Sequence, residues 1–207
     1  MSQSENTCLN DASGLIWSYS QHFHAEARGE EVIEHLLSLC TKATQRNMLG
    51  AQLLDERRHV QLFKKVTDKV GLDHSADSFS KGYVKLVQSQ KSLSEKIFCF
   101  QILTESVSAA FCRWRLTQHQ EPVFKNIDLE VLHDEERHMS MGHCLLSICD
   151  QDEKTSILTA ERRKTLVRDM ASICNNSLAL SDSNAAKTLT RIISKGLVAE
   201  ARHYVDA

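Results

Sequence analysis

A five-residue motif, Asp-Glu-x-Arg-His, occurs twice in this 207-residue sequence, in "LLDERRHVQLF" (53–63) and in "VLHDEERHMSM" (131–141). Apolar residues surround both copies, although acids, arginines and histidines are seldom buried without partners. A chain that places the same charged cluster in two separate apolar segments must fold so that each cluster meets compensating groups. This requirement restricts the possible folds more than any other feature of the sequence.

A distant glutamate precedes each copy of the motif at the same interval. The interval along the chain from Glu26 to Glu56 equals the interval from Glu105 to Glu135. The whole pattern, Glu followed by Asp-Glu-x-Arg-His, therefore occurs twice with the same internal spacing. The two halves of the chain are expected to supply equivalent sets of side chains to one site.

The composition predicts an all-α fold. One proline and seven glycines leave few residues that interrupt helices, and 42% of the residues are hydrophobic. Apolar residues recur at three- and four-residue steps through most of the chain. The length suits a single domain, 1–207, with a four-helix core bundle at about 13–150 and accessory helices at about 153–205.

Periodicity and turn residues predict the boundaries of the helices. Polar residues 1–12 are expected to fray, and "GLDHSADSFSKGY" (71–83) is expected to be a linker into a short helix that ends near Gln90. The predicted core helices span about 13–40, 44–70, 92–119 and 122–149, and the predicted accessory helices span about 153–180 and 184–204.

These boundaries predict which side chains meet. In an antiparallel helix pair, two residues lie level when they are equally far from the turn, and the midpoints of both Glu-to-Glu intervals fall in predicted turns. Glu26 should therefore face Glu56, and Glu105 should face Glu135, each pair about 22 Å from its turn. In each motif the histidine follows the glutamate by three residues, so both side chains project from one face of the helix. Two packed hairpins would bring four carboxylates and two histidines together.

Four buried carboxylates need positive charge beside them, because an unpaired buried ion is costly or becomes protonated. Two divalent metal ions would balance them. One Glu from each of two helices, with Glu-x-x-His from each of the other two, is the arrangement of di-iron and di-manganese carboxylate sites in helical bundles. Carboxylate and imidazole ligands together suit iron or manganese better than zinc. The candidate metal ligands, which are also the candidate catalytic residues, are Glu26, Glu56, His59, Glu105, Glu135 and His138.

Each motif also contains an aspartate and an arginine that we expect to act on the site without binding metal. Asp55 and Asp134 each come directly before a candidate ligand. From there each can accept a hydrogen bond from the distal N–H of a histidine on the neighbouring helix. Arg58 and Arg137 would neutralise these aspartates.

At these residues the sequence resembles the ferritin-like di-iron carboxylate superfamily, over about residues 16–149. The doubled pattern is most similar to the oxygenase branch, which includes p-aminobenzoate N-oxygenase-like enzymes and cyanobacterial aldehyde-deformylating oxygenases. The N-oxygenases have a further histidine four residues before the last glutamate, where this chain has Val131. The resemblance implies a ferritin-like four-helix bundle that binds two iron ions, with manganese as an alternative, and takes O2 as co-substrate.

The function implied is that of an oxidoreductase, a non-haem di-iron oxygenase or oxidase. Such an enzyme uses O2 to oxidise a small organic substrate, here one expected to belong to biosynthetic metabolism. The protein part supplies ligands, orientation and a dry pocket. The sequence shows no redox domain, so electrons are expected from an external donor, either a ferredoxin or a flavoprotein.

Three other functions stay open on the same fold. A ferroxidase or iron-storing protein would use the same ligands, but ferritins are nearly bare four-helix bundles, and here the predicted accessory helices follow the core bundle. A rubrerythrin-like peroxidase usually adds a Cys-x-x-Cys iron domain, and this sequence has no such motif. A hydroxylase of modified tRNA bases would be favoured by excess positive charge, whereas the net charge here is -2.

Simpler interpretations apply to parts of the pattern. One Asp-Glu-x-Arg-His motif alone would more often be a solvated helix face with ion pairs, and only the doubled pattern favours metal. Glu30, one turn after Glu26, is a carboxylate that shifts during turnover, a residue at the solvent end of the site, or a replacement ligand. His22, one turn before Glu26, is more typical of a partly exposed polar residue than of a ligand.

Composition also limits compartment and partners. The seven cysteines are odd in number and lack paired spacing, and no charged-then-apolar signal begins the sequence, so a reducing compartment, the cytoplasm, is expected. No apolar run is long enough to predict a membrane span. Basic residues are interspersed with acids, so no nucleic-acid partner is expected. The oligomeric state stays open, with a homodimer as one outcome.

Overall fold

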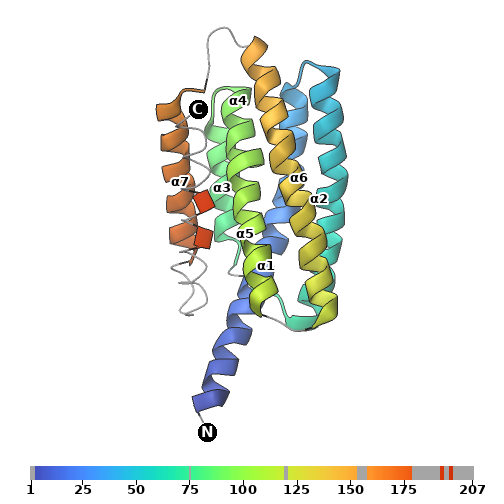
Figure 1. The fold of residues 1–207 in the computed structure, drawn as a ribbon, viewed down its shortest axis with the longest axis vertical. Helices are drawn as coiled ribbons and strands as arrows, with labels where there is room; N and C mark the ends of the chain where they lie inside the picture. The colour runs from blue at the N-terminus through green and yellow to red at the C-terminus, as the bar shows by residue number, and fades with distance from the viewer. Residues whose placement is uncertain are drawn as a thin grey trace.

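The computed structural model describes residues 3–74, 76–118, 121–152, 158–178, 192–193 and 196–197. These residues form helices joined by short turns, with no β-strand among them (Figure 1). The predicted all-α class is therefore confirmed. In chain order the elements are α1 (Gln3–Leu39), α2 (Ala43–Val70), α3 (Ser78–Ser89), α4 (Leu93–Ile97), the π-helical segment η1 (Phe98–Thr104), α5 (Glu105–Gln118), α6 (Pro122–Asp152) and α7 (Ala160–Leu178).

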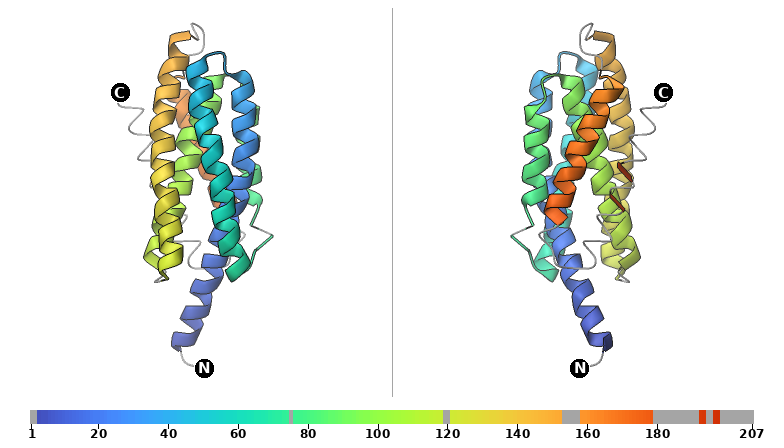
Figure 2. Two further views of the ribbon diagram at one scale, coloured as in Figure 1. Left: turned by 90° about the vertical axis from the view of Figure 1, so that its right-hand side faces the viewer. Right: turned by 90° about the vertical axis from the view of Figure 1, so that its left-hand side faces the viewer.

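Four long helical segments lie side by side, namely α1, α2, the rod formed by α4, η1 and α5, and α6 (Figures 1 and 2). α1 and α2 form one antiparallel hairpin, and α5 and α6 form another whose turn lies at the opposite end of the molecule. α3 packs against α1 and returns the chain to the start of α4. α7 packs on α3 and η1, on the outside of the hairpins (Figure 2, right).

Local sequence signals explain where several helices begin and end. Gly71 ends α2 with a φ of +103°, a conformation that glycine adopts without steric cost, and its N–H donates to the carbonyl of Thr67 at 2.8 Å. Ser92 caps α4, since its Oγ accepts from the N–H of Glu95 at 3.1 Å. Pro122 opens α6, where its missing N–H costs no helical hydrogen bond.

The π-helical segment η1 lies immediately before Glu105. Its wider turn is closed by Thr104 Oγ1, which donates to the carbonyl of Cys99, five residues earlier, at 3.0 Å. A Cβ atom on Gly142 of α6 would lie only 2.6 Å from Gln101 Cβ, so a glycine is needed where η1 presses against α6. Single π-turns inside α-helices often occur at functional sites, which directs attention to the residues around Glu105.

Three predicted boundaries differ from the structure. α1 begins at Gln3 instead of near residue 13, because residues 3–12 are polar but include no proline or glycine to stop a helix. The single helix predicted at 92–119 is divided by η1. Of the accessory helices, α7 covers 160–178, whereas the helix predicted at 184–204 lies largely outside the described residues. None of the described helices combines the length and apolar character needed to cross a membrane.

Candidate metal centre

Four helices present acidic side chains to one point in the core. α1, α2, α5 and α6 supply them, and each of the six candidate ligands is at most 3% exposed. The two hairpins bring these side chains together at equal distances from their turns, as the equal Glu-to-Glu intervals predict. The six side chains are Glu26 from α1, Glu56 and His59 from α2, Glu105 from α5, and Glu135 and His138 from α6.

Five of these side chains form two overlapping groups of ligand atoms. In the first group, atoms of Glu26, Glu56 and His59 all lie within 4.8 Å of one another. In the second group, atoms of Glu56, Glu105 and His138 do the same. Because Glu56 belongs to both groups, its carboxylate lies where it could be shared by two ions.

Glu135 lies between the two imidazoles. Its Oε1 is 3.7 Å from His59 Nδ1, and its Oε2 is 3.5 Å from His138 Nδ1. Neither Glu135 Oε2 nor His138 Nδ1 has a hydrogen-bond partner among the described residues, although both atoms are buried. Buried polar atoms rarely lack partners, and two ligand-type atoms left unsatisfied side by side fit a position for a cation. The residues present thus suit a metal pair.

Aspartates from the opposite helix orient both imidazoles. His59 Nε2 lies 3.1 Å from Asp134 Oδ2, and His138 Nε2 lies 3.4 Å from Asp55 Oδ2. An ionised carboxylate only accepts, so each Nε2 carries the proton and each Nδ1 faces the carboxylate cluster. The sequence predicts this pairing, in which the histidine of each helix, α2 or α6, bonds to the aspartate of the other. The pairing leaves the Nδ1 lone pair of a neutral imidazole free to bind metal.

Two arginines complete a charged ring at the edge of the cluster. Arg58 Nη2 donates to Asp55 at 3.1 Å and to Asp134 at 2.5 Å, and Arg137 Nη2 donates to the same aspartates at 2.9 and 2.6 Å. Burial alone would raise the pKa of Asp55, but hydrogen bonds from His138 and Arg137 outweigh it and lower that pKa to about 2. The pKa of Asp134 is lowered for the same reason. Both aspartates are therefore ionised acceptors at neutral pH.

The two histidines have raised pKa values in this acidic surrounding. Burial opposes a charged imidazole, but Glu26 and Asp134 outweigh it and raise the pKa of His59 to about 10. The pKa of His138 is raised as well, against burial, by Asp55 and the neighbouring glutamates. Both imidazoles hold a proton on each nitrogen at neutral pH until a cation replaces the Nδ1 proton.

The four glutamates divide into two pairs. Burial and then mutual repulsion raise the pKa of Glu56 and of Glu105 well above the ordinary value, so these two tend to be neutral acids. Burial is outweighed at Glu26 by His59 and at Glu135 by its neighbour Glu105, so the pKa of both is lowered and they tend to be ionised. Two imidazolium groups thus balance two carboxylates, which keeps the buried cluster close to neutral.

Glutamine side chains hold one edge of the cluster. Gln52 Nε2 donates to Glu56 Oε1 at 2.9 Å and to Glu105 Oε1 at 2.6 Å, and its Oε1 accepts from Gln101 Nε2 of η1. The Gln101 bond fixes the direction of the Gln52 amide, so both of its N–H groups point at carboxylates. These glutamines were not among the predicted site residues, although both lie on the apolar stripes that carry the glutamates.

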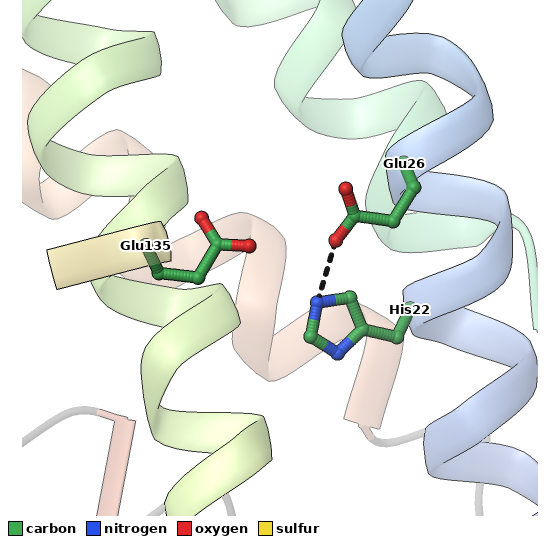
Figure 3. Close-up of side chains that lie close together, drawn as sticks. All are labelled: His22, Glu26 and Glu135. Atoms are coloured by element: carbon green, nitrogen blue, oxygen red, sulfur yellow. Dashed lines mark ion pairs between the residues drawn. The ribbon is translucent and has the colours of Figure 1, made fainter. Parts of the chain in front are cut away.

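His22 holds Glu26 from one turn earlier on α1. Its Nε2 is 2.7 Å from Glu26 Oε1, and the carboxylate of Glu135 points toward this pair from the other side (Figure 3). Arg115 Nη2 lies 2.8 Å from His22 Nδ1, and an arginine can only donate, so Nδ1 is the acceptor and Nε2 carries the proton. Burial and Arg115 lower the pKa of His22. It is therefore a neutral hydrogen-bond donor to Glu26, buried instead of partly exposed.

Arg115 belongs to a buried network that the sequence reading missed. Its Nε donates to Asp128 Oδ1 at 2.8 Å, Tyr19 donates to Asp128 Oδ2 at 2.9 Å, and all three side chains are at most 1% exposed. The equal-distance rule that pairs Glu105 with Glu135 does not pair these two, because Arg115 lies five residues before the midpoint at residue 120 and Asp128 lies eight residues after it. Linear spacing therefore offers no signal for this network.

Glu30 does not join the cluster. Its Oε2 accepts from Arg57 Nε at 3.0 Å, and its side chain is 31% exposed. The structure therefore places Glu30 at the solvent side of α1, in an ion pair with α2. A surface pair of this kind contributes little to stability.

A narrow cavity of about 20 Å³ lies beside the carboxylates. Glu26, Glu56 and Glu105 form its polar wall. Gly29 keeps this wall open, since a Cβ atom there would lie 3.1 Å from Glu56 Oε2. Aromatic side chains from α3, η1 and α5 form the facing wall, namely Phe79, Tyr83, Phe100 and Phe111. The mostly apolar lining beside a few convergent polar groups is typical of a pocket for a small molecule.

Comparison with known proteins does not identify the chain. No family model matches it, and no curated protein shows a significant match. The function must therefore be argued from the chemistry of the site.

Proposed function

We propose that this protein is a ferritin-like di-iron carboxylate enzyme that uses O2 to oxidise a small organic substrate. One observation carries the proposal. The buried cluster of four carboxylates and two Nδ1-facing histidines opens directly on a mostly apolar cavity. A metal pair next to a closed organic pocket is what an oxygenase or oxidase needs, because water would quench its oxidant. Manganese is the alternative metal.

The roles of the ligands follow from their positions. Glu26 with His59, and Glu105 with His138, would each hold one ion, while Glu56 and Glu135 would be shared. When bound, the two ions would activate O2, and O2 would supply the oxidising equivalents. The electrons would come from an external ferredoxin or flavoprotein.

The remaining residues hold the site in one geometry. Asp55 and Asp134 keep the proton on each imidazole Nε2, so that Nδ1 points inward. Gln52 and His22 each donate to carboxylate oxygens and thereby fix which oxygen faces the metals. The aromatic wall of the cavity excludes water from the reacting groups.

Metal content tests the first part of the proposal. Iron-reconstituted protein should contain about two iron ions per chain by elemental analysis. Glu135→Gln should lower this content, because it removes a shared carboxylate, while the helices persist in circular dichroism. Glu136→Gln is the matched control, since this neighbouring side chain is exposed and pairs with Arg113 outside the cluster. One tightly held zinc ion, or no metal, would refute the proposal.

Turnover with excess ferrous iron in air separates an oxygenase from an iron-storing protein. A storage protein needs an open polar route for iron, whereas the cavity here is mostly apolar. Oxidation of ferrous iron should stop once the metal site of each chain has been filled about once. Continued oxidation of hundreds of ions into a soluble mineral would instead establish the ferritin-type alternative, and reduction of peroxide at the expense of iron would establish the rubrerythrin-type alternative.

A further inference from the structure

Gln21 has a buried amide group with no partner among the described residues. The side chain is 1% exposed, and neither its Nε2 nor its Oε1 has a hydrogen-bond partner among the described residues. Leaving a buried donor and a buried acceptor unsatisfied is destabilising, and native proteins seldom tolerate it without a reason. The amide of Gln21 is therefore available to a molecule that is not part of the protein.

Gln21 lines the cavity beside the metal-ligand cluster. It lies on one stripe of α1 with Trp17, Ala25 and Gly29, at successive four-residue steps that place all four on one face. Ala25 and Gly29 carry little or no side chain, so the cavity extends along α1 from Glu56 to the Gln21 amide. The helical rise between Gly29 and Gln21 is about 12 Å.

A second, tightly packed apolar pocket lies beyond Gln21. Trp17 and Ile193 line it, and it shares Phe79 and Phe111 with the first cavity. The two spaces therefore meet at these aromatic rings, and Gln21 of the first lies one helical turn from Trp17 of the second. The Gln21 side chain therefore lies next to apolar surface from both pockets.

The charges around the cavity indicate what Gln21 can recognise. Its lining residues include three glutamates and no lysine or arginine, so an anionic group would find no positively charged side chain there. An unpaired amide offers two N–H donors and one carbonyl acceptor. The complementary ligand group is neutral and both donates and accepts, as a hydroxyl or an amide does.

We infer that Gln21 is the substrate-recognition residue of this site, and that the substrate is a mainly apolar molecule with one neutral hydroxyl or amide group. The oxidation of this substrate rests on the proposed function, whereas its binding by Gln21 does not. The Gln21 amide binds the polar group and sets its distance from the carboxylates. The apolar parts of the substrate occupy the space between Gly29 and the aromatic rings.

Binding of three small probes with the same pentyl chain tests the inference. Hexanamide offers a donor and an acceptor, methyl pentyl ketone offers an acceptor only, and hexanoate carries a negative charge. Calorimetric titration of the metal-free and of the anaerobic ferrous protein should show hexanamide binding about tenfold more tightly than the ketone, and hexanoate should bind weakest to the metal-free protein.

The decisive variant is Gln21→Met, which keeps the shape of the side chain but removes both polar atoms. Its ratio of hexanamide to ketone affinity should fall to about one, and its melting temperature should stay the same or rise, because no protein hydrogen bond is lost. Gln45→Met is the matched control. Gln45 is also buried, but its amide bonds to Cys149 and Lys42, so this variant should melt lower and keep the selectivity.

Three outcomes overturn the inference. These are equal affinities of hexanamide and ketone in the wild type, an unchanged ratio in Gln21→Met, or a lower melting temperature of that variant. If the protein binds no metal but shows the Gln21-dependent selectivity, the proposed function fails and the recognition site stands. If metal binds as expected and the selectivity is absent, only the recognition site fails.

Discussion

Loading the cluster with two divalent ions should release about four protons per chain near neutral pH. The pKa of His59 is raised to about 10, and that of His138 is raised too, so each imidazole must lose its Nδ1 proton before it can bind metal. Glu56 and Glu105 also have raised pKa values and must ionise to become ligands. Two imidazolium protons and two carboxyl protons make about four, and their charge equals that of two divalent ions.

The sign of the pH dependence follows from this count. All four groups have pKa values raised above their ordinary range, so protons compete with metal at neutral pH and the competition weakens as pH rises. The overall constant for binding two ions should increase by about four orders of magnitude per pH unit near neutrality, or about a hundredfold per ion. The effect should level off once the pH passes these raised pKa values.

Anaerobic calorimetry with Mn(II) measures the released protons directly. Titrations are repeated in buffers that differ in ionisation enthalpy. The slope of the observed binding enthalpy against the buffer ionisation enthalpy gives the number of protons released. Glu56→Gln should lower that number by about one, because glutamine has no acidic proton. Glu30→Gln should leave it unchanged, since Glu30 is half-buried in an ion pair with Arg57 away from the cluster. A wild-type release below about two protons would refute the assignment of protonated side chains.

Other predictions concern the residues around the ligands. Asp134→Asn should weaken metal binding by about ten- to a hundredfold, because it removes the acceptor that orients His59. Competition with a chelator measures the affinity, and an unchanged affinity would contradict this role. Arg115→Met should lower the free energy of unfolding by about 3–5 kcal/mol in urea titrations, because it leaves Asp128 charged and buried, and Asp128→Leu added to it should recover much of the loss. The pKa of Asp55 is lowered to about 2 from an unfolded value of about 3.9. Its contribution of at most about 2 kcal/mol is present above about pH 4 and is lost as the pH falls toward 2, so acid titrations of wild type and Asp55→Asn should converge there. Curves that stay parallel would show that this carboxylate gains nothing on folding.

The composition of the buried cluster of glutamates and histidines could be read from the sequence because it depends on linear spacing. Residues equally far from a turn lie level in an antiparallel hairpin, and residues three apart share one helix face, so Glu26, Glu56 and His59 had to meet. The hydrogen bonds of Asp55 and Asp134 to the histidine of the opposite helix, α6 or α2, followed from the same geometry. Both relations hold for almost any pair of straight helices, and the structure shows both.

Tertiary packing alone decided what surrounds that cluster. An apolar stripe says which helix face is buried but not which neighbour covers it, so the contact of His22 with Arg115 was not readable from α1. The cavity exists because α3, η1 and α1 approach one another with small residues such as Gly29 between them. The Gln21 amide likewise lacks a partner among the described residues because of how the helices around it pack. Spacing along one helix determines ligands, whereas empty space and unpaired polar atoms arise only when several helices pack together.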